Sequence, residues 1–129
     1  MYLSLLYVAC IFSIIRSALA ATNALGTPGM AAYGMTKAAT HQLLDTISQT
    51  GSGGLPMSSL AVAILPVTID SAGNRAAMPD ADKSTWTNPR DIAERLFAWA
   101  SKDPSVQLPH NGCKIRIQTI DNKTKFIMA

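Results

Sequence analysis

One run of apolar residues, Leu60 to Val67, constrains the fold of this chain more than any other feature. Strands that are buried on both faces of a parallel sheet read as unbroken apolar runs, whereas strands with one solvent-exposed face alternate. Pro66 stops such a strand, because proline cannot donate a hydrogen bond to the ladder. The run therefore predicts a buried strand of a parallel sheet, and with it an α/β fold.

Two helices are expected around this strand. Residues 30–48 contain no proline and a single glycine, and apolar helix formers supply one face: Ala31, Ala32, Ala38, Ala39, Leu43, Leu44 and Ile47. The second helix begins at Asn88-Pro89, a capping residue followed by proline at the first helical position. Its predicted apolar face consists of Ile92, Ala93, Leu96, Phe97 and Ala100. The glycine-rich run 51–56 reads as a flexible connection.

The remaining segments read as a long loop and a pair of strands. Residues 68–87 show no periodicity, and an unstructured stretch of about twenty residues usually forms a lid or a binding segment. Further on, Cys113, Ile115 and Ile117 alternate with polar residues, which predicts a strand with one buried face. The sequence 121–123 could turn this strand into a short partner that ends at Phe126-Ile127.

Residues 1–22 form an apolar leader, and residues 23–129 form the domain proper. The leader is apolar up to Ile15, where Arg16 interrupts it, so it is shorter than the roughly 20 residues that span a bilayer. Ala18-x-Ala20 resembles a signal-peptidase site, but a positively charged start is missing. A signal peptide or membrane anchor, a buried element of the fold and an unrelated sequence all remain open.

Charge and cysteine content exclude several classes of function. The net charge is only +3, and the eleven Lys and Arg residues are scattered, so no basic stripe for nucleic acid is present. Cys10 and Cys113 have no companion at C-x-x-C spacing, which argues against a zinc site or a disulfide framework. We therefore expect reduced thiols, no metal and no nucleic-acid partner.

Tyr33 and Lys37 are the residues whose spacing suggests chemistry. Four residues apart on a helix, their side chains lie on one face, one turn apart. A cation within roughly 4–6 Å lowers the pKa of a phenol, which would allow a tyrosine to exchange a proton with a substrate at neutral pH. The pair alone is also compatible with an ordinary amphipathic helix surface.

The neighbours of Tyr33 and Lys37 extend this pattern. Residues 27–39, TPGMAAYGMTKAA, resemble the active-site segment of the short-chain dehydrogenase/reductase family, in which the helix is followed by a glycine-rich turn and a buried strand that ends in proline. The resemblance covers roughly residues 25–126 and is greatest to members that reduce pterins. It is carried by residues 26–30, 33–35, 37, 41–43, 65–68, 74–75, 78–79, 81–82, 84 and 86–87.

The resemblance implies hydride transfer from NADH or NADPH to quinonoid dihydrobiopterin, which yields tetrahydrobiopterin. Tyr33 would donate the proton and Lys37 would support it and reach the cofactor. Val67 and Thr68, which follow the strand-ending proline, would lie beside the nicotinamide. Four residues of the 68–87 loop are candidates for closing over the pterin, although each also fits as an ordinary loop residue: Asn74, Arg75, Met78 and Trp86.

The implied fold is the C-terminal part of a Rossmann-like, doubly wound parallel sheet. Its N-terminal dinucleotide-binding half is missing, because no glycine-rich turn for a pyrophosphate precedes Tyr33. Without that half, the strand at 60–67 is expected to lack parallel neighbours, and the truncated chain could be inactive. The alternative is a non-catalytic isoform that acts as a dimerisation module, since the helix of Tyr33 and Lys37 commonly forms a homodimer in the family. We expect a cytoplasmic protein, with secretion or anchoring through residues 1–20 as the alternative.

Overall fold

The computed structural model describes residues 15–16, 29–49 and 59–128. In chain order the elements are β1 (Ile15–Arg16), α1 (Ala31–Ile47), β2 (Ala63–Pro66), α2 (Ala72–Ala77), α3 (Pro89–Ala100), β3 (Lys114–Ile120) and β4 (Lys123–Met128). Apart from β1, the predicted leader lies outside the described residues, as do the 51–56 connection and Cys10. Among the helices that the structure describes, none combines the length and the apolar character needed to cross a membrane.

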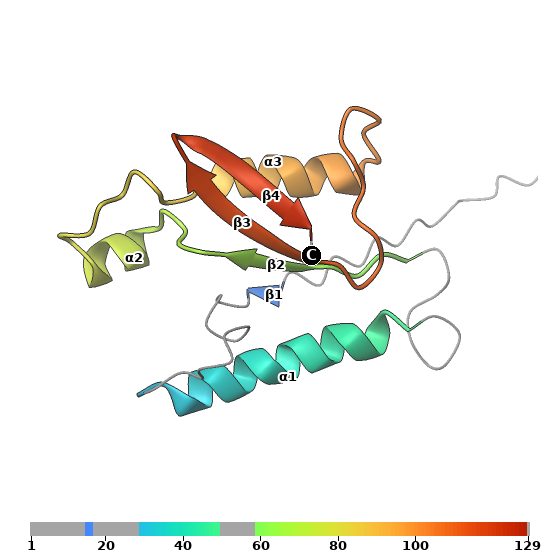
Figure 1. Ribbon diagram of the computed structural model, residues 1–129, viewed down its shortest axis with the longest axis horizontal. Coiled ribbons are helices and arrows are strands. Elements are labelled where there is room, and N and C mark those ends of the chain that lie inside the picture. Colours follow the sequence, from blue (N-terminus) through green and yellow to red (C-terminus); the bar gives the residue numbers. More distant parts are fainter. Residues whose placement is uncertain (1–14, 17–28, 50–58, 129) are drawn as a thin grey trace, which may run out of the picture.

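The strands form one mixed sheet in the order β1-β2-β3-β4 (Figure 1). β2 pairs in parallel with β1 on one edge and with β3 on the other, and β4 runs antiparallel to β3. The expectation that the strand at 60–67 lacks parallel neighbours is therefore wrong, because β3 returns from downstream in the chain and Ile15–Arg16 supply the opposite edge. The prediction of an α/β fold is confirmed.

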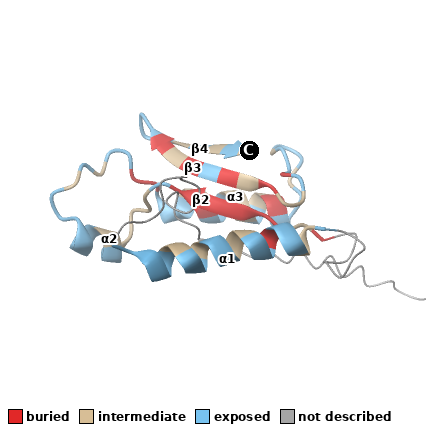
Figure 2. Cartoon of the chain, turned by 60° about the horizontal axis from the view of Figure 1, so that its bottom comes forward, coloured by how far each residue is buried: buried red, intermediate tan, exposed pale blue. Residues whose placement is uncertain are grey.

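Both faces of β2 are buried, as its continuous apolar sequence predicts (Figure 2). Ala61, Ala63 and Leu65 pack against Leu44 of α1 on one face of the sheet. Val62 and Ile64 point to the other face, where they join Trp99 and Ile92 of α3. The result is a three-layer arrangement with α1 on one side of the sheet and α3 on the other (Figure 1).

Helix α3 begins where its sequence predicts. The Asn88 side chain accepts a hydrogen bond of 2.9 Å from the Arg90 N–H, and Pro89 occupies the first turn. The predicted apolar face is only half right. Ile92, Leu96 and Trp99 pack on the sheet, whereas Ala93, Phe97 and Ala100 are exposed, Phe97 by 75%. A helix contacts a sheet along a narrow stripe, and side chains at positions i, i+4 and i+7, such as Ile92, Leu96 and Trp99, fill that stripe.

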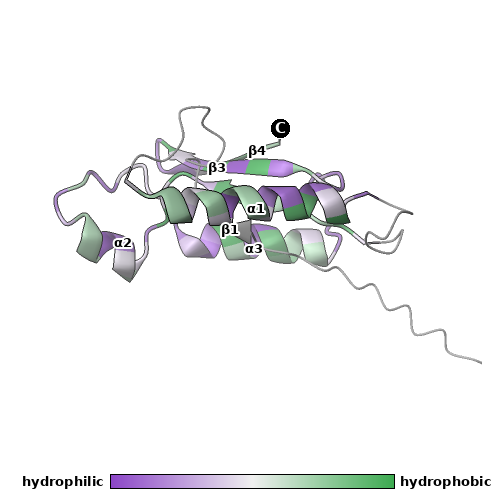
Figure 3. Cartoon of the chain, turned by 90° about the horizontal axis from the view of Figure 1, so that it is seen from below, coloured by the Kyte–Doolittle hydropathy of each residue, from purple (hydrophilic) through white to green (hydrophobic). Residues whose placement is uncertain are grey.

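Helix α1 has the predicted extent, but most of its apolar residues are not buried. Leu44 is the one buried residue among its 17 residues, and Ile47 packs beside it. Ala31, Met35, Ala39 and Leu43 form a second stripe at i, i+4 spacing, and all four are exposed. Figure 3, which looks onto α1, shows apolar turns along this outer surface.

Strands β3 and β4 form the predicted hairpin. Cys113, Ile115 and Ile117 are buried against α3, and the intervening residues face away. Asp121 and Asn122 connect the strands with positive φ angles of 50° and 56°, the conformation of a tight hairpin turn whose twist matches that of the strands. The Thr124–Thr119 and Ile115–Met128 pairings fix the register.

Candidate functional site

Three segments of the site predicted from the sequence lie at one end of the molecule (Figures 1 and 2). The parallel strand β2 ends there, α1 begins there, and α2 with its flanking loop projects beyond the sheet. In open α/β sheets, ligands bind outside the carboxyl ends of the strands. The location of these segments is therefore that of a ligand site in this class of fold.

Tyr33 and Lys37 are in contact at the start of α1. The Lys37 ammonium lies 5.4 Å from the centroid of the Tyr33 ring, a cation–π distance that the i, i+4 spacing on the helix provides. Both belong to the helix stripe that runs on to the buried Leu44, so they face the sheet side of α1. Tyr33 keeps 39% of its surface exposed. The pair thus joins a phenol open to a ligand with a fixed positive charge.

Val67 and Thr68 continue directly from β2. The Val67 N–H donates to the Ile117 carbonyl at 2.9 Å, and the Thr68 carbonyl accepts from the Thr87 N–H at 2.8 Å. These bonds fix the backbone of both residues at the carboxyl edge of the sheet. The Val67 side chain is exposed at this edge.

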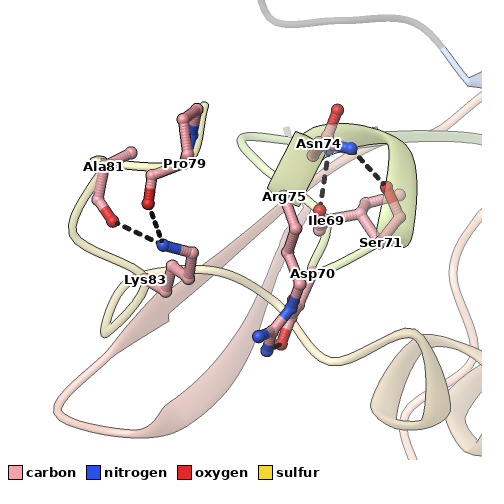
Figure 4. Close-up of polar contacts among 8 residues, drawn as sticks. All are labelled: Ile69, Asp70, Ser71, Asn74, Arg75, Pro79, Ala81 and Lys83. Carbon is pink, nitrogen blue, oxygen red and sulfur yellow. Dashed lines mark hydrogen bonds and ion pairs between the residues drawn. The ribbon is translucent and has the colours of Figure 1, made fainter. Parts of the chain in front are cut away.

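The prediction that residues 68–87 form a loop without secondary structure is wrong in part, because this segment contains α2. The Ser71 hydroxyl caps the helix by accepting from the Asn74 N–H at 3.2 Å, and the Asn74 side chain donates to the Ile69 carbonyl at 2.8 Å (Figure 4). Arg75 makes two hydrogen bonds to Asp70. The bond from Arg75 lowers the pKa of the Asp70 carboxyl, and the same bond raises the pKa of Arg75.

The later part of the same loop is folded around Lys83. Its ammonium donates to the carbonyls of Pro79 at 2.7 Å and Ala81 at 3.2 Å, and lies 5.6 Å from the Trp86 ring centroid. Trp86 is buried, whereas Met78 is exposed. Of the four loop residues predicted to close over a pterin, the structure thus leaves Met78 open, engages Asn74 and Arg75 within the loop, and packs Trp86 inside.

The sequence of this chain resembles that of a known enzyme. The chain is 42% identical over 113 residues to a dihydropteridine reductase of Dictyostelium discoideum, and the alignment covers 88% of this chain and 47% of that protein. This chain is similar to a dihydropteridine reductase. It spans about half the length of the relative. A comparison with models of known protein families finds no match.

Two residues of the site are not evident from the sequence. Asp70 and Lys83 carry the polar contacts of the loop, yet no motif marks either of them. The spacing Ser71-x-x-Asn74 is a capping signal that could have indicated α2, and Asp70 lies within reach of Arg75 only once this helix forms. His41 of α1 is half-buried. Burial and then the charge of Lys114 lower its pKa, and Asp45 opposes this.

No group of three or more potential metal ligands occurs in the described ranges 15–16, 29–49 and 59–128. In these ranges, Cys113 lies buried as a thiol.

Proposed function

We propose that this chain carries the proton-donating and pterin-facing part of a dihydropteridine reductase, which reduces quinonoid dihydrobiopterin to tetrahydrobiopterin with NADH or NADPH. The observation that carries the proposal is the Tyr33–Lys37 contact near the carboxyl end of the parallel strand β2, within a chain that is similar to a dihydropteridine reductase. The similarity supports the reductase identity, and the Tyr33–Lys37 contact supports the proton-donating role.

Each residue then has a defined task. The Tyr33 phenol donates a proton to the pterin, and the Lys37 charge stabilises the phenolate that remains. When bound, the nicotinamide cofactor supplies the hydride. The exposed loop residue Met78 offers an apolar surface to the flat pterin ring, and Asn74, Arg75 and Trp86 maintain the loop around it.

The described residues fit the reacting end of a nicotinamide cofactor. Val67 and Thr68 hold their backbone rigidly at the edge of the sheet, where they would meet the nicotinamide amide, and Lys37 would reach the adjoining ribose. A glycine-rich turn for the pyrophosphate does not occur in the described stretches. We therefore expect this chain alone to bind NADH with a dissociation constant weaker than about 1 μM, which is a binding free energy less favourable than about −8 kcal/mol.

The fold is consistent with this proposal. Strands β2 and β3 are parallel and are joined through α3, which gives a β-α-β unit with helices on both sheet faces. We infer that residues 23–129 are the C-terminal part of a Rossmann-like domain, and that β4 extends its edge. The cytoplasm, where thiols such as Cys113 stay reduced, is the compartment we propose.

A chimera tests the proposal. In the Dictyostelium dihydropteridine reductase, the segment that matches this chain is replaced by the corresponding residues of this chain, and pterin-dependent oxidation of NADH and NADPH is followed by absorbance. We expect turnover, with the preferred cofactor unchanged from the relative. A chimera that folds, as judged by its melting transition, and shows no pterin-dependent oxidation would contradict the proposal.

A second candidate is a homodimerisation module, and the exposed stripe of α1 favours it. Met35 is 72% exposed and Leu43 50%, and about 200° of helix rotation separates Met35 from Tyr33. The stripe therefore points away from the catalytic pair, and a second copy could cover it. Sedimentation should show a dimer that Met35→Glu dissociates, whereas Phe97→Glu, on exposed α3 surface, leaves it intact. A monomer at all concentrations would exclude this candidate.

A further inference from the structure

The 68–87 loop is closed at its base by backbone hydrogen bonds. The Asp70 N–H donates to the Thr87 carbonyl at 2.8 Å, and the Thr87 N–H donates to the Thr68 carbonyl at the same distance. The Thr87 hydroxyl in turn accepts a bond of 3.1 Å from Thr119 of β3. The base is therefore fixed to the sheet, and Asp70 is part of this base.

The polar contacts of the loop itself remain inside it. Within the described part of the chain, the side-chain bonds and ion pairs of residues 71–86 all end on residues 69–86 (Figure 4). Two separate sets of contacts result. The first joins α2 to the base through Asp70 and Ile69, and the second folds residues 79–86 around Lys83.

Asp70 and Arg75 form a two-point link between α2 and the base. The Arg75 Nε lies 2.5 Å from Asp70 Oδ1, and its Nη2 lies 2.7 Å from Oδ2, so the guanidinium contacts both carboxylate oxygens. Exposed ion pairs usually contribute little, but a two-point contact fixes orientation as well as distance. Five residues separate the partners, so little loop entropy is lost when the contact forms.

We propose that Asp70 is a positioning residue, which acts through Arg75 to hold α2 against the base of the 68–87 loop in the arrangement that receives the pterin. Arg75 then serves the reaction through the shape of the loop, and its guanidinium is engaged by Asp70 instead of by substrate. This inference rests on the proposed function only for the identity of the ligand. The ordering of α2 by Asp70 can be measured without catalysis.

Hydrogen exchange of the whole chain tests the positioning role directly. Asp70→Asn should accelerate exchange of the Arg75 and Met78 amides, which bond to Ser71 and Asn74, by about fivefold or more, because α2 opens more often. The double variant Asp70→Arg with Arg75→Asp, which swaps the two charges, should restore slow hydrogen exchange. As a matched control, Glu94→Gln breaks the exposed Arg90–Glu94 pair on α3 and should leave the loop unchanged. Unchanged exchange in Asp70→Asn would overturn the proposal.

Kinetics of the chimera provide the second measurement. Asp70→Asn should raise KM for the pterin about fivefold while kcat stays within about a factor of two. The double variant Asp70→Arg with Arg75→Asp should return KM to the parent value. If the double variant restores slow hydrogen exchange but its KM stays high, Arg75 contacts the pterin itself and the proposal is wrong. A chimera without turnover contradicts the proposed function alone, because the exchange experiment still decides whether Asp70 holds α2.

Discussion

Helices α1 and α3 lie on opposite faces of one sheet and are held there in different ways. The 12-residue α3 has a side-chain cap at Asn88, and two buried residues, Ile92 and Trp99, anchor it. The 17-residue α1 has Met30 at its N-cap position, where no side-chain hydrogen bond caps the helix, and it buries Leu44 alone. Length therefore does not measure how firmly a helix is attached to this sheet.

The two helices also differ in how much of their length packs into the core. Contacts of α3 run along its whole length, and Trp99 also donates to the Gln107 carbonyl at 3.0 Å and meets Phe126 edge-on. Among the described residues, α1 packs into the core through Leu44 and Ile47, near its carboxyl end. In the first turns of α1, Tyr33 keeps 39% of its surface exposed.

The largest effect is expected from truncating the anchor of α3. Trp99→Ala removes a fully buried ring and should reduce the free energy of unfolding by about 3–5 kcal/mol. The control Phe97→Ala, two residues away on the exposed side, should change it by no more than about 0.5 kcal/mol. Urea titrations compare the two variants, and equal losses would mean that α3 is not held by its sheet-facing stripe.

Truncation of Leu44, which anchors α1, should lower the free energy of unfolding less than Trp99→Ala does, and its effect should be more local. Leu44→Ala should reduce the free energy of unfolding by about 2–4 kcal/mol, and hydrogen exchange should increase first in α1. Leu43→Ala, at the exposed neighbouring position, is the matched control and should be close to neutral. If Leu43→Ala is as damaging as Leu44→Ala, the exposed stripe of α1 is covered in solution.

The side-chain cap of α3 should also contribute to the stability of that helix. Asn88→Ala removes the acceptor for the Arg90 N–H and should destabilise α3 by about 1 kcal/mol, whereas Asn88→Asp keeps an acceptor and should be tolerated. Thermal unfolding of the two variants gives the comparison. Equal melting temperatures for Asn88→Ala and the parent would show that the cap does not hold the start of α3.

The smallest effect concerns His41, where α1 meets β3. Its folded-state pKa lies below the ordinary value of 6.5, because burial and then the Lys114 charge disfavour the imidazolium and Asp45 only partly compensates. The contribution of neutral His41 to the free energy of unfolding is therefore complete above pH 6.5. It is lost as the pH falls through the lower folded-state pKa of His41. His41→Asn should flatten this part of the stability profile, measured by urea titration at several pH values. If His41→Asn leaves the slope of stability against pH unchanged, this pH dependence does not come from His41.

Sequence patterns predict the elements whose residues carry their own signals. The apolar run at β2, the Asn88-Pro89 start of α3 and the alternation in β3 all match the structure. These signals are local, because burial or capping is encoded within a few residues. The Tyr33–Lys37 contact is predictable for the same reason, since helix geometry alone brings the two side chains together.

Features that depend on tertiary contacts were not predictable. The sequence of α1 does not reveal that Leu44 is buried while Leu43 is exposed, because that depends on where the helix meets Ala61 and Leu65. The six-residue α2 is too short to show periodicity, and it is held by the Asp70–Arg75 pair. One of the two parallel neighbours of β2 is β3, whose residues lie about fifty positions further along the chain, as in the pairing of Ala63 with Lys114.

Replacement of the Tyr33 hydroxyl tests the central claim most directly. In the chimera with the Dictyostelium reductase, Tyr33→Phe removes the proposed proton donor and leaves the ring beneath Lys37 in place. Pterin-dependent turnover should fall by about 10²–10⁴-fold, the usual contribution of general acid catalysis, while Glu94→Gln on α3 retains it. Turnover of Tyr33→Phe within about a factor of two of the parent would show that Tyr33 is not the proton donor.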